Sequence, residues 1–136
     1  MEHEPHRAAQ EVFEIIQKPE RLDELNNYYT DDFIQVDRRS LVALPDLDGP
    51  GMIEMLRLGH EAGLEQFDVE YLAARGERLI LNRMRTRFAD GSVKDYLTVA
   101  QWNSALTKYE RHVRFDVADL DAALAELDRL YTELDD

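Results

Sequence analysis

The sequence contains no cysteine, so neither a disulfide framework nor thiolate chemistry is available to it. It also lacks any apolar run that approaches the about 20 residues of a membrane-spanning helix, and its first residues show no basic region followed by an apolar stretch. We therefore expect a soluble, cytoplasmic protein without membrane partners. Its 136 residues suffice for a core without disulfides or metals, and we expect one domain over residues 1–136.

Basic residues are scarce, and the formal net charge is −13. This charge argues against nucleic acids as partners, because they bind to cationic surface. The bases are concentrated, since residues 75–115 hold 9 bases and 4 acids whereas residues 1–74 hold 6 bases and 17 acids. Two interpretations remain open: charge pairing between sheet and helices, worth about 0–1 kcal/mol for each exposed pair, and a cationic pocket mouth for an acidic or electron-rich ligand.

Three turn signals divide residues 67–115 into four alternating runs rich in Val, Leu, Tyr, Thr and Phe. The turns are Arg75–Arg78, Ala89–Ser92 and Asn103–Leu106. Alternating runs between such turns are typical of successive hairpins, so they predict a four-stranded antiparallel meander.

The turns also predict which strand residues are neighbours, because side chains alternate between the two faces of a sheet. A two-residue connection at Gly76-Glu77 places Glu70 opposite Arg83 and Asp68 opposite Arg85. A two-residue connection at Asp90-Gly91 places Tyr96 opposite Arg85 and Thr98 opposite Arg83. This register puts Arg83, Arg85, Tyr96 and Thr98 on one face, whereas Tyr71, Met84, Leu97 and Val99 form an apolar surface on the other.

Helical spacing of apolar residues marks the rest of the chain. It predicts an amphipathic helix over residues 5–17, a short helix that begins at Pro19, a third helix near residues 52–62 and a C-terminal helix after Asp116. Residues 33–38 read as a short strand. The predicted fold class is α+β: a curved antiparallel sheet, made of the four-stranded meander plus a short strand, with three helices from the N-terminal half and a C-terminal helix on one side of it.

Two stretches carry a family resemblance: residues 29–37, which follow two short helices, and residues 115–123. With the element order, they resemble SnoaL-like domains of the nuclear transport factor two superfamily over essentially the whole chain. The resemblance implies a cone-shaped pocket between the concave sheet face and the helices, and often a homodimer. It does not select a reaction, because such domains include isomerases, hydratases, epoxide hydrolases, polyketide cyclases and pure binding domains.

The site residues follow from comparison with ketosteroid isomerase, which has the same fold. Asp37 falls where that family has its base, whereas Phe13 and Thr98 stand where it has its two oxyanion donors. Tyr96 or Arg83 could act as donor instead, so we predict that Asp37, Arg83 and Tyr96 share one pocket as catalytic groups, with Asp37 as the acid/base. A strand pattern like that of limonene epoxide hydrolase is not complete, because its two carboxylates are missing.

Further residues are predicted to contact the ligand. They are Phe13, Tyr28, His60, Arg85, Thr98 and Trp102. Each candidate also has a structural interpretation: Asp37 as a turn residue that binds nearby backbone amides, the arginines as a ladder with Glu70 and Asp68, and Trp102 and His60 as core residues. His112 is interpreted as a surface residue.

No spacing in the chain resembles a metal site, a phosphate-binding glycine loop or a serine nucleophile turn, so we predict no metal and no cofactor. The leading hypothesis is a pocket that binds an apolar, ring-bearing or polyketide-like small molecule, with or without isomerisation, cyclisation or hydration through Asp37. The alternative is a non-catalytic ligand-sensing or dimerisation module. A homodimer is predicted through the apolar face of Tyr71, Met84, Leu97 and Val99, because monomers rarely expose such a surface.

Overall fold

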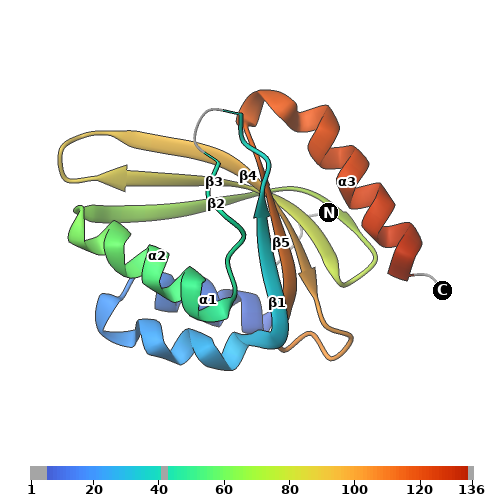
Figure 1. The fold of residues 1–136 in the computed structure, drawn as a ribbon, viewed down its shortest axis with the longest axis horizontal. Helices are drawn as coiled ribbons and strands as arrows, with labels where there is room; N and C mark the ends of the chain where they lie inside the picture. Colours follow the sequence, from blue (N-terminus) through green and yellow to red (C-terminus); the bar gives the residue numbers. More distant parts are fainter. Residues whose placement is uncertain (1–5, 41–42, 135–136) are drawn as a thin grey trace.

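A computed structural model describes residues 6–40 and 43–134, which form a strongly curved sheet with helices on both faces (Figure 1). The elements in chain order are α1 (Arg7–Ile16), the 3-10 helix η1 (Pro19–Tyr28), β1 (Tyr29–Asp37), α2 (Gly49–Glu61), β2 (Leu64–Arg75), β3 (Leu79–Phe88), β4 (Val93–Trp102), β5 (Tyr109–Phe115), the 3-10 helix η2 (Val117–Asp119) and α3 (Leu120–Leu134). The predicted α+β class is confirmed.

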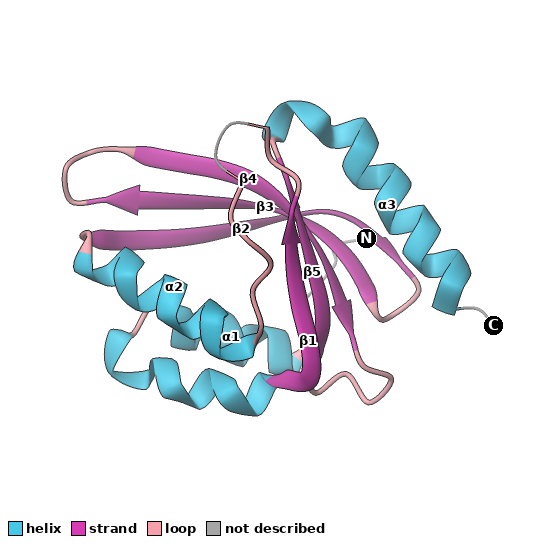
Figure 2. Cartoon of the chain, in the orientation of Figure 1, coloured by secondary structure: helices cyan, strands magenta, loops and turns pink. Residues whose placement is uncertain are grey.

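The strands follow the order β1-β5-β4-β3-β2. Strands β2 to β5 pair as the predicted antiparallel meander, and β1 adds to β5 in parallel, which makes the sheet mixed (Figure 2). A parallel neighbour needs a long crossover. In this chain the crossover from β1 to β5 consists of α2 and the strands β2, β3 and β4. The N-terminal strand therefore meets the last strand rather than the first of the meander.

Helices α1, η1 and α2 cover the concave face of the sheet, where the larger core cluster lies. Helix α1 buries Val12, Ile15 and Ile16, which its helical period places on one side. Helix α2 begins after Asp48, whose side chain accepts a hydrogen bond from the backbone N–H of Gly51 at 2.8 Å. Pro50 stands in its first turn, where a missing N–H costs nothing.

Helix α3 lies on the opposite, convex face, so the prediction that all helices lie on one side is wrong (Figure 1). The convex cluster is apolar: Leu79, Leu81, Leu97, Val99, Val113 and Phe115 from the sheet pack against Ala123, Leu127 and Leu130 from α3. A sheet that is apolar on both faces needs a second layer on each of them, and here helices provide both layers.

The surface predicted for a homodimer is also wrong. Leu97 and Val99 are covered by α3, and Met84 lies in the concave core, so these three side chains are buried on two different faces. Tyr71 alone of the four is exposed, at 41%. The dimer itself stays a prediction, but this face does not provide it.

The connection between β3 and β4 is longer than predicted, and this shifts the register by one residue. The backbone N–H of Phe88 donates to the carbonyl oxygen of Ser92, so three residues, 89–91, connect the paired positions in place of the predicted two. Gly91 has a φ of 88°, where only glycine is unstrained, and the Asp90 carboxylate accepts from the backbone N–H of Ser92. Tyr96 is therefore paired with Met84 and Thr98 with Asn82, whereas the predicted pairs of β2 with β3 are present. A one-residue slip moves every side chain of a strand to the other face.

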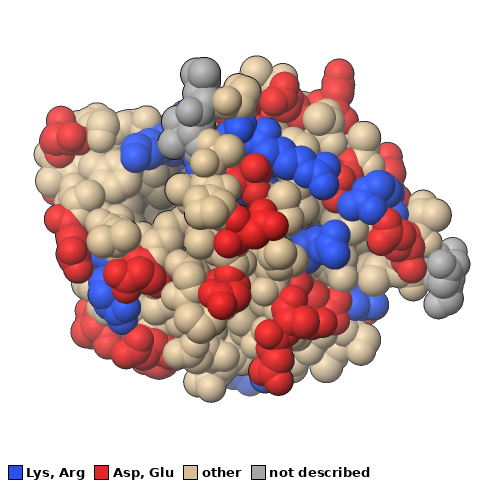
Figure 3. Space-filling model, in the orientation of Figure 1, with Lys and Arg blue, Asp and Glu red and all other residues tan. Residues whose placement is uncertain are grey.

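Acidic and basic side chains are interleaved on the face shown in Figure 3. None of the helices in the described part of the chain is long and apolar enough to cross a membrane.

Candidate ligand-binding site on the concave face

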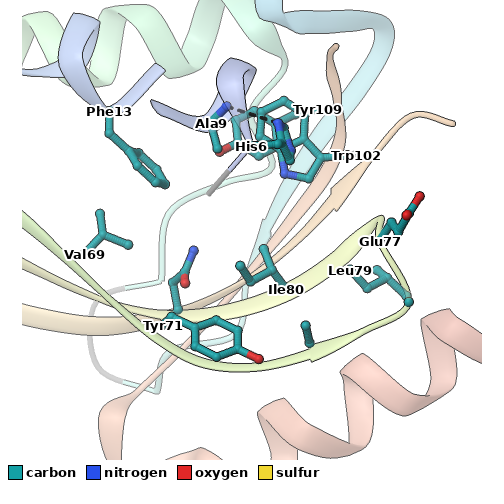
Figure 4. A pocket seen from close by; sticks show the side chains of 13 residues that line it. His6, Ala9, Phe13, Val69, Tyr71, Glu77, Leu79, Ile80, Trp102 and Tyr109 are labelled. Atoms are coloured by element: carbon teal, nitrogen blue, oxygen red, sulfur yellow. Dashed lines mark hydrogen bonds between the residues drawn. The ribbon is translucent and has the colours of Figure 1, made fainter. Parts of the chain in front are cut away.

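A cavity of about 290 Å³ lies between α1 and the strands of the concave face (Figure 4). Its walls are mainly apolar and aromatic, with Phe13 and Ala9 from α1, and Val69, Ile80 and Trp102 from three strands. Asn82, His6 and Glu77 add polar atoms to the lining. Concave, largely apolar spaces with a few polar groups are typical of small-molecule sites.

Aromatic side chains form one end of this cavity. The rings of Trp102 and Tyr109 stack with centroids 3.8 Å apart, and His6 meets the Trp102 ring edge-on at 4.3 Å. Trp102 is the only tryptophan of the chain and is 2% exposed. Stacked rings give a flat, rigid wall that complements a ring-bearing ligand.

A second, smaller cavity of about 40 Å³ adjoins the first, because Phe13 and Tyr109 contribute to both walls. Polar side chains gather around it: Tyr29, Gln35, Tyr96, Thr98, His112 and Arg114. The pairing of the strands accounts for this cluster, since Asn82 is paired with Thr98, Thr98 with Arg114, and Arg114 with Asp37. Cross-strand partners share a face, so a polar row crosses the concave face and leads from the larger cavity past the smaller one.

Burial sets the protonation of this cluster. His112 is 8% exposed, and its burial together with the nearby Arg114 charge lowers its pKa from 6.5 to about 3, so the imidazole is neutral at physiological pH. Burial also raises the pKa of Tyr29 and Tyr109 well above 10, so both phenols stay protonated. His112 was interpreted as a surface residue, and that interpretation is wrong, because its strand position points inward.

Asp37 lies at the end of this row, but its carboxylate is held by Arg39. The Arg39 guanidinium donates through Nε at 2.9 Å and through its terminal nitrogen at 2.6 Å, and the backbone N–H groups of Arg39 and Leu44 donate at 3.1 Å each. Burial alone would raise the pKa of Asp37, but these four donors outweigh it, and the pKa lies below its ordinary value. The carboxylate is ionised, fully covered and absent from the walls of both cavities.

Arg83 and Arg85 lie on the convex face, away from Asp37 and Tyr96. Both guanidinium groups donate to Asp95, at 3.1 Å from Arg83 and 3.0 Å from Arg85. The predicted convergence of Asp37, Arg83 and Tyr96 is therefore wrong, because it depended on the shorter turn between β3 and β4. The interpretation of the arginines as a ladder has the right face and the right cross-strand neighbours, Glu70 and Asp68, but both guanidinium groups donate their hydrogen bonds to Asp95.

The remaining candidates separate into those at the cavities and those elsewhere. Phe13, Thr98 and Trp102 line one cavity or both. Tyr28 lies at a surface hollow beside Ala8 and Leu106. His60 is half-buried, and its Nε2 lies 2.7 Å from the carbonyl oxygen of Ile16. The roles of all these residues in ligand contact stay predictions.

Sequence reasoning missed Gln35, Tyr109 and Arg114. For Tyr109 and Arg114 the signal is the alternation of β5. Tyr109, His112 and Arg114 all face the concave side, although the alternation is interrupted once where β5 pairs with Gln101 and Trp102. The sequence could not show that β1 pairs with β5 in parallel and brings Gln35 beside them. Among residues 6–40 and 43–134, no group of three or more metal-binding side chains is present.

Comparison with known proteins supports the fold. No protein-family model and no curated protein matches the sequence. Solved structures do match it. A candidate SnoaL-like polyketide cyclase from Shewanella putrefaciens has a TM-score of 0.59 and 16% identity, over 93% of this chain and 99% of that one. A candidate isomerase of the SnoaL-like family from Agrobacterium tumefaciens has a TM-score of 0.56 and 14% identity, over 79% of this chain and 92% of that one, and the pinacolase BvnE from Penicillium brevicompactum has a TM-score of 0.57 and 13% identity, over 92% of this chain and 88% of that one. The chain thus shares its fold with SnoaL-like and NTF2-like proteins. At such identities the likeness concerns the fold alone.

Proposed function

We propose that this protein binds a small, apolar, ring-bearing molecule of polyketide-like character in the larger concave cavity. The observation that carries the proposal is the space of about 290 Å³ between α1 and the sheet, walled by Phe13, Val69, Ile80 and the stacked Trp102 and Tyr109. This volume is close to the lower end of small-molecule sites, which measure about 300–1,000 Å³. A ligand of one or two fused rings matches it.

Binding is better supported than acid–base catalysis. A general base must reach the proton that it abstracts, and its pKa must lie near the working pH. Asp37 meets neither condition in this structure, because Arg39 covers its carboxylate and holds its pKa low. Isomerisation, cyclisation or hydration through Asp37 therefore stays a prediction, as do cytoplasmic location, a homodimer and the absence of nucleic-acid partners. A ligand-sensing role uses the same cavity.

A titration with 1-tetralone, a neutral bicyclic ketone, tests the proposal. Trp102 is the only tryptophan and lines the cavity, so its fluorescence reports occupancy directly. We expect a dissociation constant on the order of 0.1–1 mM for a ligand of this size.

A variant pair locates the binding. Val69→Phe fills the cavity wall and should weaken binding at least about tenfold, whereas Val93→Phe adds the same bulk at an exposed position of β4, where Val93 is 48% exposed, and should change nothing. Equal binding by both variants, or no binding by the wild type, would contradict the proposal.

A further inference from the structure

Arg114 is a buried cation without an acid. Arg114 is 8% exposed. No carboxylate in residues 6–40 and 43–134 lies within ion-pairing distance of its guanidinium. Its Nε donates to Gln35 Oε1 at 2.9 Å, and its guanidinium lies 4.2 Å from the centroid of the Tyr96 ring. These contacts stabilise the cation only in part, because a buried guanidinium is ordinarily matched by an anion.

Two further polar groups beside Arg114 lack partners. Gln35 is 0% exposed, and because its Oε1 accepts from Arg114, its amide Nε2 is left as a donor with no acceptor in the described chain. The Nε2 of His112 is likewise buried and has no hydrogen-bond partner there. Buried polar groups are nearly always paired, so two unpaired nitrogens and an uncompensated guanidinium around one small cavity indicate a missing polar partner.

The neighbouring acid does not supply this acceptor. Asp37 is the cross-strand partner of Arg114, yet its carboxylate accepts from Arg39 and from two backbone N–H groups. The pair of Asp37 and Arg39 is neutral as a unit, and Arg114 remains as an uncompensated positive charge. The chain has a net charge of −13, yet Arg114, the basic residue among the buried polar side chains of the described residues, has no acid beside it.

We infer that the ligand of the concave face carries a carboxylate, which occupies the smaller cavity and is bound by Arg114, with the Gln35 amide as a second donor. The rings then lie in the larger cavity, which shares Phe13 and Tyr109 with the smaller one. Arginine is suited to this task because its planar fork binds a carboxylate through two parallel hydrogen bonds. The inference rests on the proposed function and adds the charge of the ligand and the residues that select it.

A matched ligand pair tests the inference on the unmodified protein. 2-Naphthoate and 2-naphthamide have the same rings and nearly the same shape, and only the first is an anion. We expect naphthoate to bind at least about tenfold more tightly, as charge-assisted hydrogen bonds in a buried site require. Equal binding of the two compounds would overturn the inference and leave the proposed function intact.

A matched variant pair assigns the preference to Arg114. Arg114→Met should remove the preference for naphthoate while naphthamide still binds. Arg111→Met makes the same change two to three positions earlier on β5, on the face turned toward Glu126, and should keep the preference. A preference that survives in Arg114→Met would overturn the assignment.

If neither naphthyl compound binds, the proposed function fails for ligands of this size, and acetate then decides the inference separately. The Nε–H signal of Arg114 in a nitrogen-15 spectrum should shift on titration with acetate but not with acetamide. An unchanged signal would overturn the anion site as well.

Discussion

Both faces of the sheet bury an apolar cluster, the larger one on the concave face, but they differ in the polar groups and cavities that lie among the apolar side chains. On the convex face, α3 closes over an apolar cluster that contains no polar member from the sheet. On the concave face, α1, η1 and α2 cover a cluster that encloses two cavities and the buried Gln35, Asn82, Thr98, His112 and Arg114. Cavities and unpaired polar groups both reduce stability, so their concentration on one face indicates that this face serves binding and the other serves folding.

The largest expected effect tests the packed face. Leu127→Ala removes a side chain that is 0% exposed in α3, and it should lower the free energy of unfolding by about 3–5 kcal/mol, because it removes apolar contacts and leaves a new cavity. Urea unfolding measures this. Leu58→Ala on α2, where Leu58 is 54% exposed, is the control and should change little. A loss below about 1 kcal/mol for Leu127→Ala would mean that α3 does not seal the convex face.

A smaller loss is expected from the ion pair at the rim of the concave face. Asp37→Asn keeps the shape of the side chain but removes the charge that holds Arg39, and it should cost about 2–3 kcal/mol, because breaking a covered pair leaves the partner without compensation. Arg39 retains some exposure, at 14%, and this keeps the loss below that of a fully buried pair. Unchanged urea unfolding would show that Asp37 is not structural and would restore it as a candidate for chemistry.

His112 predicts how stability depends on pH. Its pKa is about 6.5 in the unfolded chain and about 3 in the folded one, so between these values only the unfolded chain binds the proton. The free energy of unfolding should therefore fall as pH falls through this window, by up to about 1.4 kcal/mol per pH unit. His112→Gln should show a shallower slope between pH 6 and about 4.5, above the range of ordinary carboxyl groups.

The pH range above 7 serves as the control, because there His112 is neutral in both the folded and the unfolded chain. In that range the free energy of unfolding should depend on pH equally in the variant and the wild type. Equal slopes below pH 6 would mean that the folded protein accepts the proton, and that the concave face is wetter than its burial indicates.

The smallest effect is expected from the charged part of the convex face beyond α3. Asp95→Asn breaks the contacts of Asp95 with Arg83 and Arg85, but these groups are partly or largely exposed to water, so the loss should stay below about 1 kcal/mol and shrink further with added salt. A loss as large as that of Asp37→Asn would erase the difference between the two ion pairs.

Local patterns in the sequence predict much of this fold. The helical periods of α1 and α2 and the alternation of β2 to β5 are properties of short segments, and they give the right elements with nearly the right bounds. The connection between β2 and β3 is short as predicted, with Gly76 at a φ of 62°, but it holds three residues rather than two, and an irregularity between Tyr71 and Ala73 restores the predicted pairs of Glu70 with Arg83 and Asp68 with Arg85. The resemblance of residues 29–37 and 115–123 to SnoaL-like domains led to the right fold for the same reason, since the first stretch is strand β1 and the second leads from the end of β5 into α3.

The site could not be predicted in the same way, because it depends on distances between segments. One extra turn residue between β3 and β4 moves Tyr96 and Thr98 to the concave face and separates them from Arg83, and no local propensity distinguishes the two turn lengths. The position of α3 on the convex face, and the parallel pairing that brings Gln35 to Arg114, are decided by which apolar surfaces remain to be covered once the sheet has formed. The sequence alone therefore determined the elements and the fold class, whereas only the tertiary structure decided which side chains share the cavity, because a face is a property of register and packing rather than of residue type.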